Sequence, residues 1–212
     1  MKGFALPTLM VMLALTSIAA LLAMRNLWVN EQRLNAHADQ LRTQHKAEAV
    51  LPVALADILG TAINKDAVPN LRHSAGDITQ THAFFPNSMT EYNLLRQRLG
   101  SVAGTCSAGI CAPHTLVPNA INASYWKTQT ATAITVGAAD TPYGDDTAWY
   151  WVEVFPQHST DDPHASSANL FAYRITTLAN GIMPSSRVVL QAIWVRRTPN
   201  TGQWQSWHVL HD

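Results

Sequence analysis

The sequence is poor in charged residues and in cysteine. Only 13% of the 212 residues are charged, and the 14 basic residues balance the 14 acidic ones. A net charge of zero gives no indication of a nucleic-acid partner or of attraction to an acidic lipid surface. The chain has two cysteines, so a metal site built on them would need further ligands.

The short motifs of common enzymes are also absent. The chain has no Gly-x-Ser-x-Gly nucleophile elbow, no His-Glu-x-x-His metal motif and no glycine loop that could hold a phosphate. Its nine histidines are scattered. It also lacks internal repeats and long low-complexity tracts. We therefore expect no enzyme activity and no cofactor.

The most prominent feature that is present is one long apolar run at the N-terminus. No charged residue occurs from Gly3 to Met24. As a helix this run would span roughly 33 Å, compared with about 30 Å for the hydrocarbon core of a membrane. Pro7 is tolerable because it falls in the first turn, where a backbone N–H has no helical acceptor. The run therefore predicts a single membrane-spanning helix, with a cleaved secretory signal peptide and an anchor of another kind as alternatives.

The charges beside this run conflict with the expected orientation. Only Lys2 precedes the run, whereas Arg25, Arg33 and Arg42 follow it. Counted literally, the positive-inside rule would leave most of the chain in the cytoplasm. We nevertheless expect the C-terminal part outside the cytoplasm, because very short N-terminal tails do not depend on charge alone and because the cysteines favour an oxidising compartment.

The helical pattern continues beyond the apolar run. Apolar residues recur on one side of a helix, with polar and charged residues between them; they are Leu27, Leu34, Ala38, Leu41 and Ala49. Neither glycine nor proline occurs between Arg25 and Leu51. The pattern predicts one helix of about 45 residues that ends or bends at Pro52, with a further helical stretch through Val53–Asn64. We assign residues 25–64 to an amphipathic stem.

The remaining chain, residues 65–212, comprises about 150 residues, enough for one ordinary core. Ser88-Met89-Thr90-Glu91 is a capping box that predicts a short helix through Leu99, which Gly100 can close. Five further segments have the pattern of strands, and short connections favour antiparallel pairing. These segments are Thr130–Val136, Thr147–Phe155, Leu170–Thr177, Arg187–Arg196 and Gln203–Leu210. We expect an α+β fold in which the long N-terminal helix packs on a C-terminal antiparallel sheet.

The N-terminus resembles that of type IV pilins. Those proteins begin with a basic residue, a glycine and a phenylalanine ahead of an apolar helix, as Lys2, Gly3 and Phe4 do here. The resemblance implies that a prepilin peptidase removes residues 1–3 as a leader and that the new amine of Phe4 is methylated. It also implies that residues 4–24 serve first as a membrane anchor and later as part of the filament core.

Further segments narrow the resemblance to PilX-type minor pilins. Two lie in the stem, Glu31-Gln32-Arg33 and Gln44–Leu51, and two resemble that family's final strand pair, Phe171–Thr176 and Val188–Arg197. The resemblance implies a non-enzymatic subunit that helps to prime pilus assembly and sits at or near the pilus tip. A minor pseudopilin of a type II secretion system, and a tip adhesin or DNA-receptor pilin, are the alternatives.

The same resemblance implies partners and a location. The partners would be the prepilin peptidase, other minor pilins, the major pilin and the inner-membrane assembly machinery. The chain would cross the inner membrane once, with its C-terminal domain in the periplasm, and would then enter the extracellular pilus.

Thr8 departs from the pilin pattern. Pilins usually carry glutamate at this position, the fifth after the cleavage, where it meets the N-terminal ammonium of the subunit ahead in the filament. A buried carboxylate without a partner costs several kcal/mol. A subunit with nothing ahead of it would therefore favour an uncharged residue such as Thr8. This interpretation predicts a first-in or tip subunit, with neutral drift as the alternative.

Cys106 and Cys111 lie close together in the sequence. In a periplasmic or extracellular domain they would pair and close a small loop. A zinc site would have only His114 as a near additional ligand, and a redox motif would have two intervening residues rather than four. We expect the disulfide.

Two polar clusters and several tryptophans allow further hypotheses. A metal site at residues 158–164 or a calcium site around residues 140–146 is an alternative to an ordinary polar loop. Five tryptophans fall in expected strands, where we expect them mainly in the core, with an exposed platform for a host sugar or surface as the alternative; they are Trp149, Trp151, Trp194, Trp204 and Trp207.

Overall fold

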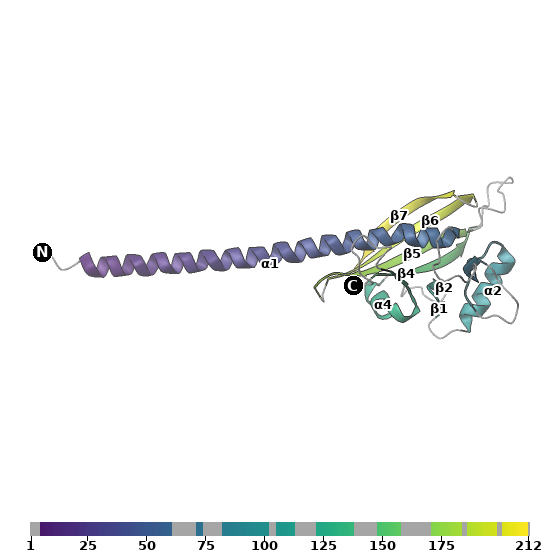
Figure 1. Cartoon of the computed structure of the whole chain (residues 1–212), viewed down its shortest axis with the longest axis horizontal. Helices are drawn as coiled ribbons and strands as arrows, with labels where there is room; N and C mark the ends of the chain where they lie inside the picture. The colour runs from purple at the N-terminus through teal and green to yellow at the C-terminus, as the bar shows by residue number, and fades with distance from the viewer. Residues whose placement is uncertain are drawn as a thin grey trace.

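The computed structural model shows a long helix, α1 (Ala5–Leu59), that projects from a globular head (Figure 1). The N-terminal part of α1 stands clear of the head, and its C-terminal part lies along the sheet (Figure 1). The expected α+β fold, a long helix on a mainly antiparallel sheet, is confirmed. The structure describes residues 5–60, 71–73, 82–101, 105–112, 122–137, 148–157, 171–183, 186–198 and 201–211.

α1 continues through Pro52, so the expectation that the helix could end there is wrong. Proline removes one backbone donor, which would have served the carbonyl of Glu48 one turn earlier. Pro52 is exposed, so water can reach that side of the helix. The helix ends at Leu59. Gly60 follows with a φ of 72° and donates its N–H to the Asp57 carbonyl over 3.1 Å, as glycine commonly does after a helix.

The described residues form a seven-stranded sheet in the order β1-β2-β4-β5-β6-β7, with β3 also paired to β4. The strands are β1 (Cys106–Ser107), β2 (Ile110–Cys111), β3 (Ile134–Val136), β4 (Ala148–Pro156), β5 (Phe171–Asn180), β6 (Arg187–Thr198) and β7 (Thr201–Leu210). All described pairs are antiparallel except β2 with β4, which is parallel. The expected strands are present, but the first is shorter because Thr130–Thr132 forms a 3-10 helix, η3.

The main core lies between α1 and one face of the sheet. Ala47, Val50, Ala54 and Ile58 recur every three or four residues and are at most 1% exposed, so they form one stripe along the helix. Strand side chains alternate between faces, and the stripe packs against the alternate residues of β4, β5 and β6. These are Tyr150, Val152, Val154, Tyr173, Ile175, Leu190, Ala192 and Trp194.

Three short helical segments add to the head: η1 (Leu71–His73), α2 (Met89–Gly100) and α4 (Ala123–Thr128). α2 begins as the capping box predicts, because the Ser88 hydroxyl accepts the N–H of Glu91 at 3.2 Å. The expected end is wrong by one residue. Gly100 is still helical, and Ser101 is the C-cap in a right-handed helical conformation, so the end of this helix requires no left-handed glycine.

A second apolar cluster covers the opposite face of the sheet. Trp126 of α4 packs against Trp151 of β4, with ring centroids 5.0 Å apart, and the cluster also contains Leu178, Val189 and Leu210. Trp151 and Trp194 are thus core residues, as expected. Trp204 and Trp207 of β7 differ, since they are 39% and 56% exposed.

Candidate functional site: the stem helix and its attachment to the head

The N-terminal half of α1 presents apolar side chains on every side. All side chains from Leu6 to Trp28 are exposed, and the large apolar ones among them are between 55% and 73% exposed. A helix that is apolar all round is stable in a membrane or inside a packed assembly, and not in water. Among the described helices α1 alone is long and apolar enough to cross a membrane, and the head buries none of its apolar span.

Two hydroxyl groups in the middle of this span are satisfied within the helix. Thr16 and Ser17 both donate to the Leu13 carbonyl, over 3.0 Å and 2.7 Å. Such local bonds allow a hydroxyl to enter an environment without water, where an unpaired polar group is costly. The span therefore meets the requirements of a hydrocarbon surrounding in both its apolar and its polar side chains.

The residues expected to direct processing and assembly belong to this end of the chain. Thr8 lies in the exposed apolar half of α1, close to the described start of the helix. Gly3 and Phe4 lie outside the described residues, as do the candidate ligands in residues 140–146 and 158–164. Within the part of the chain that is described, no group of three or more His, Cys, Asp or Glu side chains could hold a metal ion.

Where α1 leaves the sheet, a carboxylate binds the turn between β5 and β6. Asp39 is 6% exposed, and its two oxygens accept the N–H groups of Ile182 and Met183, each at 3.0 Å. The Ser186 hydroxyl, together with these two amides, holds the pKa of Asp39 below its ordinary value of 3.8 against the opposing effect of burial, because the donors stabilise the charged form. We call this arrangement the Asp39 clamp.

Close packing fixes the same turn to the helix. A Cβ on Gly181 would lie 2.4 Å from the Thr43 hydroxyl oxygen and 2.8 Å from a carboxylate oxygen of Asp39, so the turn requires glycine here. One turn further along α1, the Ala47 carbonyl accepts the hydroxyl of Thr177 at 3.0 Å. The end of β5 and the following turn are therefore attached to α1 by directional contacts.

A second carboxylate attaches the other end of α1. Asp57 accepts Arg72 Nε at 2.9 Å and the Tyr150 hydroxyl at 2.8 Å, and Arg72 Nη2 lies 2.7 Å from the second carboxylate oxygen. Arg72 Nη1 donates to the Ala108 carbonyl over 2.6 Å. This Asp57 network joins the end of α1 to η1, to β4 and, through Arg72, to the loop between the cysteines.

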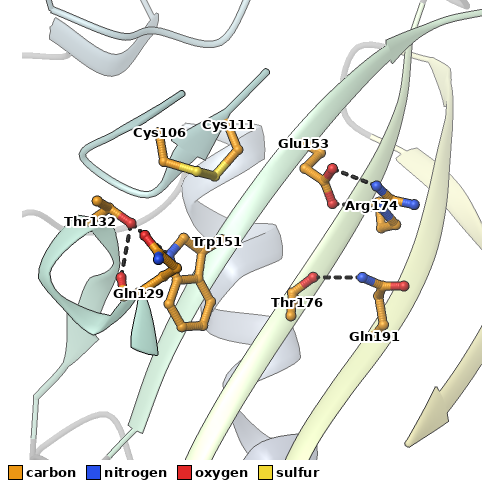
Figure 2. The surroundings of a disulfide bond; sticks show 9 residues. All are labelled: Cys106, Cys111, Gln129, Thr132, Trp151, Glu153, Arg174, Thr176 and Gln191. Atoms are coloured by element: carbon orange, nitrogen blue, oxygen red, sulfur yellow. Dashed lines mark hydrogen bonds and ion pairs between the residues drawn. A yellow bond between two sulfur atoms is a disulfide. The ribbon is translucent and has the colours of Figure 1, made fainter. Parts of the chain in front are cut away.

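The expected disulfide between Cys106 and Cys111 is present and links β1 to β2 beside β4 (Figure 2). It leaves neither thiolate available for zinc. Gly109 in the loop has a φ of 74°, and a Cβ there would lie 2.8 Å from Ile134 Cγ1. Its N–H donates to the Thr132 carbonyl over 2.7 Å. The loop is thus packed into the head.

A buried ion pair lies next to the disulfide (Figure 2). Glu153 is fully buried, pairs in register with Cys111, and accepts two hydrogen bonds from Arg174 at 2.6 Å and 2.5 Å. Burial raises the pKa of Glu153, and Arg174 opposes this shift. The Arg174 guanidinium also lies over the Phe155 ring, 5.1 Å from its centroid. Since each carboxylate oxygen of Glu153 accepts a hydrogen bond from Arg174, we assign the pair a structural role.

Residues 91–196, from α2 to near the end of β6, match the family model described as type IV pilus assembly protein PilX C-term. The chain belongs to the PilX family. The resemblance seen in the sequence is therefore confirmed, and membership of a pilus assembly family implies contacts with other pilus components. No curated protein and no solved structure matches the chain.

Sequence analysis missed the two carboxylates that attach the stem of this PilX-family protein. Asp39 and Asp57 are five helical turns apart at 3.6 residues per turn, so they lie on the same side of α1 as its buried stripe. An acidic residue on a buried stripe indicates a polar partner, so the sequence does contain a signal that these two side chains are bonded to other groups. The identity of the partner cannot be read from the sequence, because Asp39 and Ile182 are 143 residues apart in it.

Proposed function

We propose that this PilX-family chain is a minor pilin whose stem spans the inner membrane before assembly and enters the filament core afterwards. The observation that supports this is the continuity of α1. A single helix combines an N-terminal half that is apolar on all sides with a C-terminal half fixed to the head by Asp39 and Asp57. A removable signal peptide needs no such attachment, whereas a pilin stem must connect the filament core to the head.

We place the head in the periplasm before assembly and on the outside of the filament afterwards. The Cys106–Cys111 disulfide supports this side of the membrane, because disulfides persist in oxidising compartments. We give this disulfide more weight than the excess of arginine after the span, which by the positive-inside rule would leave the head in the cytoplasm. The partners in this proposal are the prepilin peptidase, the inner-membrane assembly machinery, other minor pilins and the major pilin.

We further propose that cleavage follows Gly3, that Phe4 becomes the methylated N-terminus, and that Thr8 suits a subunit that primes assembly and stays at or near the tip. The corresponding divisions are a leader (1–3), a membrane and filament-core helix (4–24), a stem (25–64) and a head (65–212). The support for the role of Thr8 is its position among exposed apolar side chains, where a carboxylate without a partner would be costly.

The mass of the mature N-terminal peptide tests this proposal. We expect the membrane-bound protein to begin at an N-methylated Phe4. An N-terminus between Ala20 and Met24 would show that the apolar run is a removed signal peptide and would contradict the pilin function. An unprocessed N-terminus at Met1 would indicate a simple anchor. Deletion of the gene then separates the rival functions, because loss of a minor pilin reduces pili, whereas loss of a pseudopilin reduces type II secretion.

A further inference from the structure

β7 is the last strand of the sheet, and no other described strand pairs with its outer edge. At the other side of the long strands, β4 is covered by β2 and β3. The side chains from Thr201 to His208 are exposed in unbroken succession. Both faces of β7 are therefore open in this region, and within the described part of the chain its outer edge is unpaired.

An open edge presents a row of backbone donors and acceptors at the spacing of another strand. Proteins commonly protect such edges with lysine, other charges or proline. β7 contains none of these between Thr201 and Leu210. The ladder with β6 is irregular beside Trp194 but regular from Ser206 to Leu210. This part of the edge is thus straight enough, and long enough, for a short strand to pair with it.

The two faces of β7 differ in polarity. Trp204 and Trp207 pair in register with Trp194 and Ala192, both in the apolar clusters under α1, so the two tryptophans lie on the α1 face. They are 39% and 56% exposed. The opposite face carries Gln203, Ser206 and His208, which pair in register with Val195, Ile193 and Gln191. A strand that fits here would be uncharged, with apolar residues on one face and polar residues on the other.

We propose that the edge of β7 accepts an extended segment of a different pilus protein as an additional strand of the sheet. Strand addition obtains its affinity from backbone hydrogen bonds and its specificity from alternate side chains. Exposed tryptophans beside the edge provide the apolar surface that such an added strand can cover. The proposal rests on the proposed function, because it takes the donor of the strand to be another component of the pilus.

A second copy of the chain does not fit this edge in the membrane. Symmetric pairing of two β7 edges makes the strands antiparallel. α1 runs lengthwise along the sheet and leaves the head at one end (Figure 1), so this pairing would point the two stems in opposite directions. Two chains anchored in one membrane carry their stems in the same direction. This geometry therefore favours a different protein as the donor of the strand over a symmetric pair of two copies.

Photo-crosslinking in piliated cells tests this proposal with the full-length protein. A benzophenone amino acid replaces Trp207, on the α1 face, or the adjacent Ser206, on the opposite face. A third variant carries it at Asn93, which is exposed on α2, as a control for chance contacts. Strand addition places one short segment against both faces of β7. We expect crosslinks from both β7 positions to neighbouring residues of a single segment in another pilus protein, and not from Asn93.

Charge introduced at the edge of β7 by substitution provides a second test of strand addition. Ser206→Lys with His208→Lys, both in the regular part of the edge, should abolish the crosslink from Trp207, because lysine on an edge opposes strand addition. The matched pair Ser206→Thr with His208→Thr should retain it, since threonine favours strands. Equal loss in both pairs would contradict the proposal.

Other outcomes of the crosslinking also overturn the proposal. Crosslinks from one face only would indicate docking on a face of the sheet, and crosslinks to β7 of a second copy would indicate self-pairing. Absence of any crosslink, with normal protein levels, would show that the edge stays free. Crosslinks are scored on whole cells, and the protein is separately sought in sheared filaments. Absence of the protein from sheared filaments would contradict the proposed function. The crosslinks from β7 would still test strand addition separately.

Discussion

Replacing Asp39 by alanine should weaken the attachment between stem and head. The substitution removes the acceptors of the Ile182 and Met183 amides and the partner of the Ser186 hydroxyl. A hydrogen bond to a charged group contributes about 1.5–3 kcal/mol. The Ile182 side chain is 77% exposed, so water can replace part of what is lost at this turn. We therefore expect the free energy of unfolding to fall by about 2 kcal/mol.

Urea unfolding of the full-length protein in detergent measures this change. The fluorescence of Trp126, Trp151 and Trp194 should report the loss of the head, because these side chains are at most 2% exposed. With a slope of about 1–3 kcal/mol per molar urea, the midpoint should fall by about 1 M while the slope stays the same. Asp39→Asn keeps one carbonyl oxygen and should lose about half as much.

The effect should depend on pH in a defined direction. The folded pKa of Asp39 lies below the ordinary value of 3.8, so the clamp contributes fully above that value and its contribution is lost as the pH falls through the folded pKa. The difference in unfolding free energy between wild type and Asp39→Asn should be constant from pH 7 to about pH 5 and should shrink below about pH 4.

Glu31→Ala is the matched control, because Glu31 is an exposed acidic residue on the same helix. We expect it to change the unfolding free energy by less than about 0.5 kcal/mol. If Asp39→Ala loses no more stability than this control, the Asp39 clamp does not attach the stem. A difference between wild type and Asp39→Asn that persists unchanged at about pH 3 would show that the charge of the carboxylate is not involved.

Three further outcomes test the chemistry of the chain. Gly3→Val should leave full-length precursor in the membrane, because the peptidase subsite expected here takes a small residue; normal processing in a blot of membrane fractions would contradict this. Replacing Cys106 and Cys111 by serine should lower the unfolding free energy by about 2 kcal/mol or less, since a short loop constrains few unfolded conformations. Two freely alkylated thiols in the native protein would instead rule out the disulfide. Thr8→Glu should give a processed, stable protein with fewer pili per cell, and normal piliation would indicate an ordinary position in the pilus shaft or neutral drift at this residue.

The parts of the fold that could be predicted are those specified by neighbouring residues. The apolar run and the stripe after it predict α1, because an α-helix brings every third or fourth residue to one side. Ser88 and Glu91 predict the start of α2, because a capping box satisfies donors within one turn. Alternation predicts the long strands. The disulfide is predicted because the two cysteines are close together in the sequence and because an oxidising compartment is expected.

The parts that could not be predicted depend on contacts between distant residues. Pro52 commonly ends a helix, yet α1 continues because packing of the following turns against the sheet outweighs one lost hydrogen bond. The parallel pairing of β2 with β4 arises from the placement of the disulfide loop. Arg72 of η1 and the Thr132 carbonyl of η3 fix this loop through hydrogen bonds with Ala108 and Gly109. The strand preferences of the residues near Cys111 do not indicate which strand this segment pairs with or in which direction.

The positions of the two carboxylates explain how the stem keeps its place on the head. Between them, α1 contacts the sheet through Ala47, Val50, Ala54 and Ile58, and apolar contacts of this kind are not directional. A helix held by them alone could shift by one turn, about 5.4 Å, and present a similar stripe. Asp39 and Asp57 prevent this shift, because their hydrogen bonds form only in one register and each lies near one end of the contact. The hydrogen bonds of Asp39 and those of Asp57 lie about 27 Å apart along the helix. With two separated attachments, the head cannot pivot about either one of them. In the proposed pilin function, a stem pulled along its axis during filament extension would require this resistance, and the two carboxylates would then matter to assembly as much as the apolar run does.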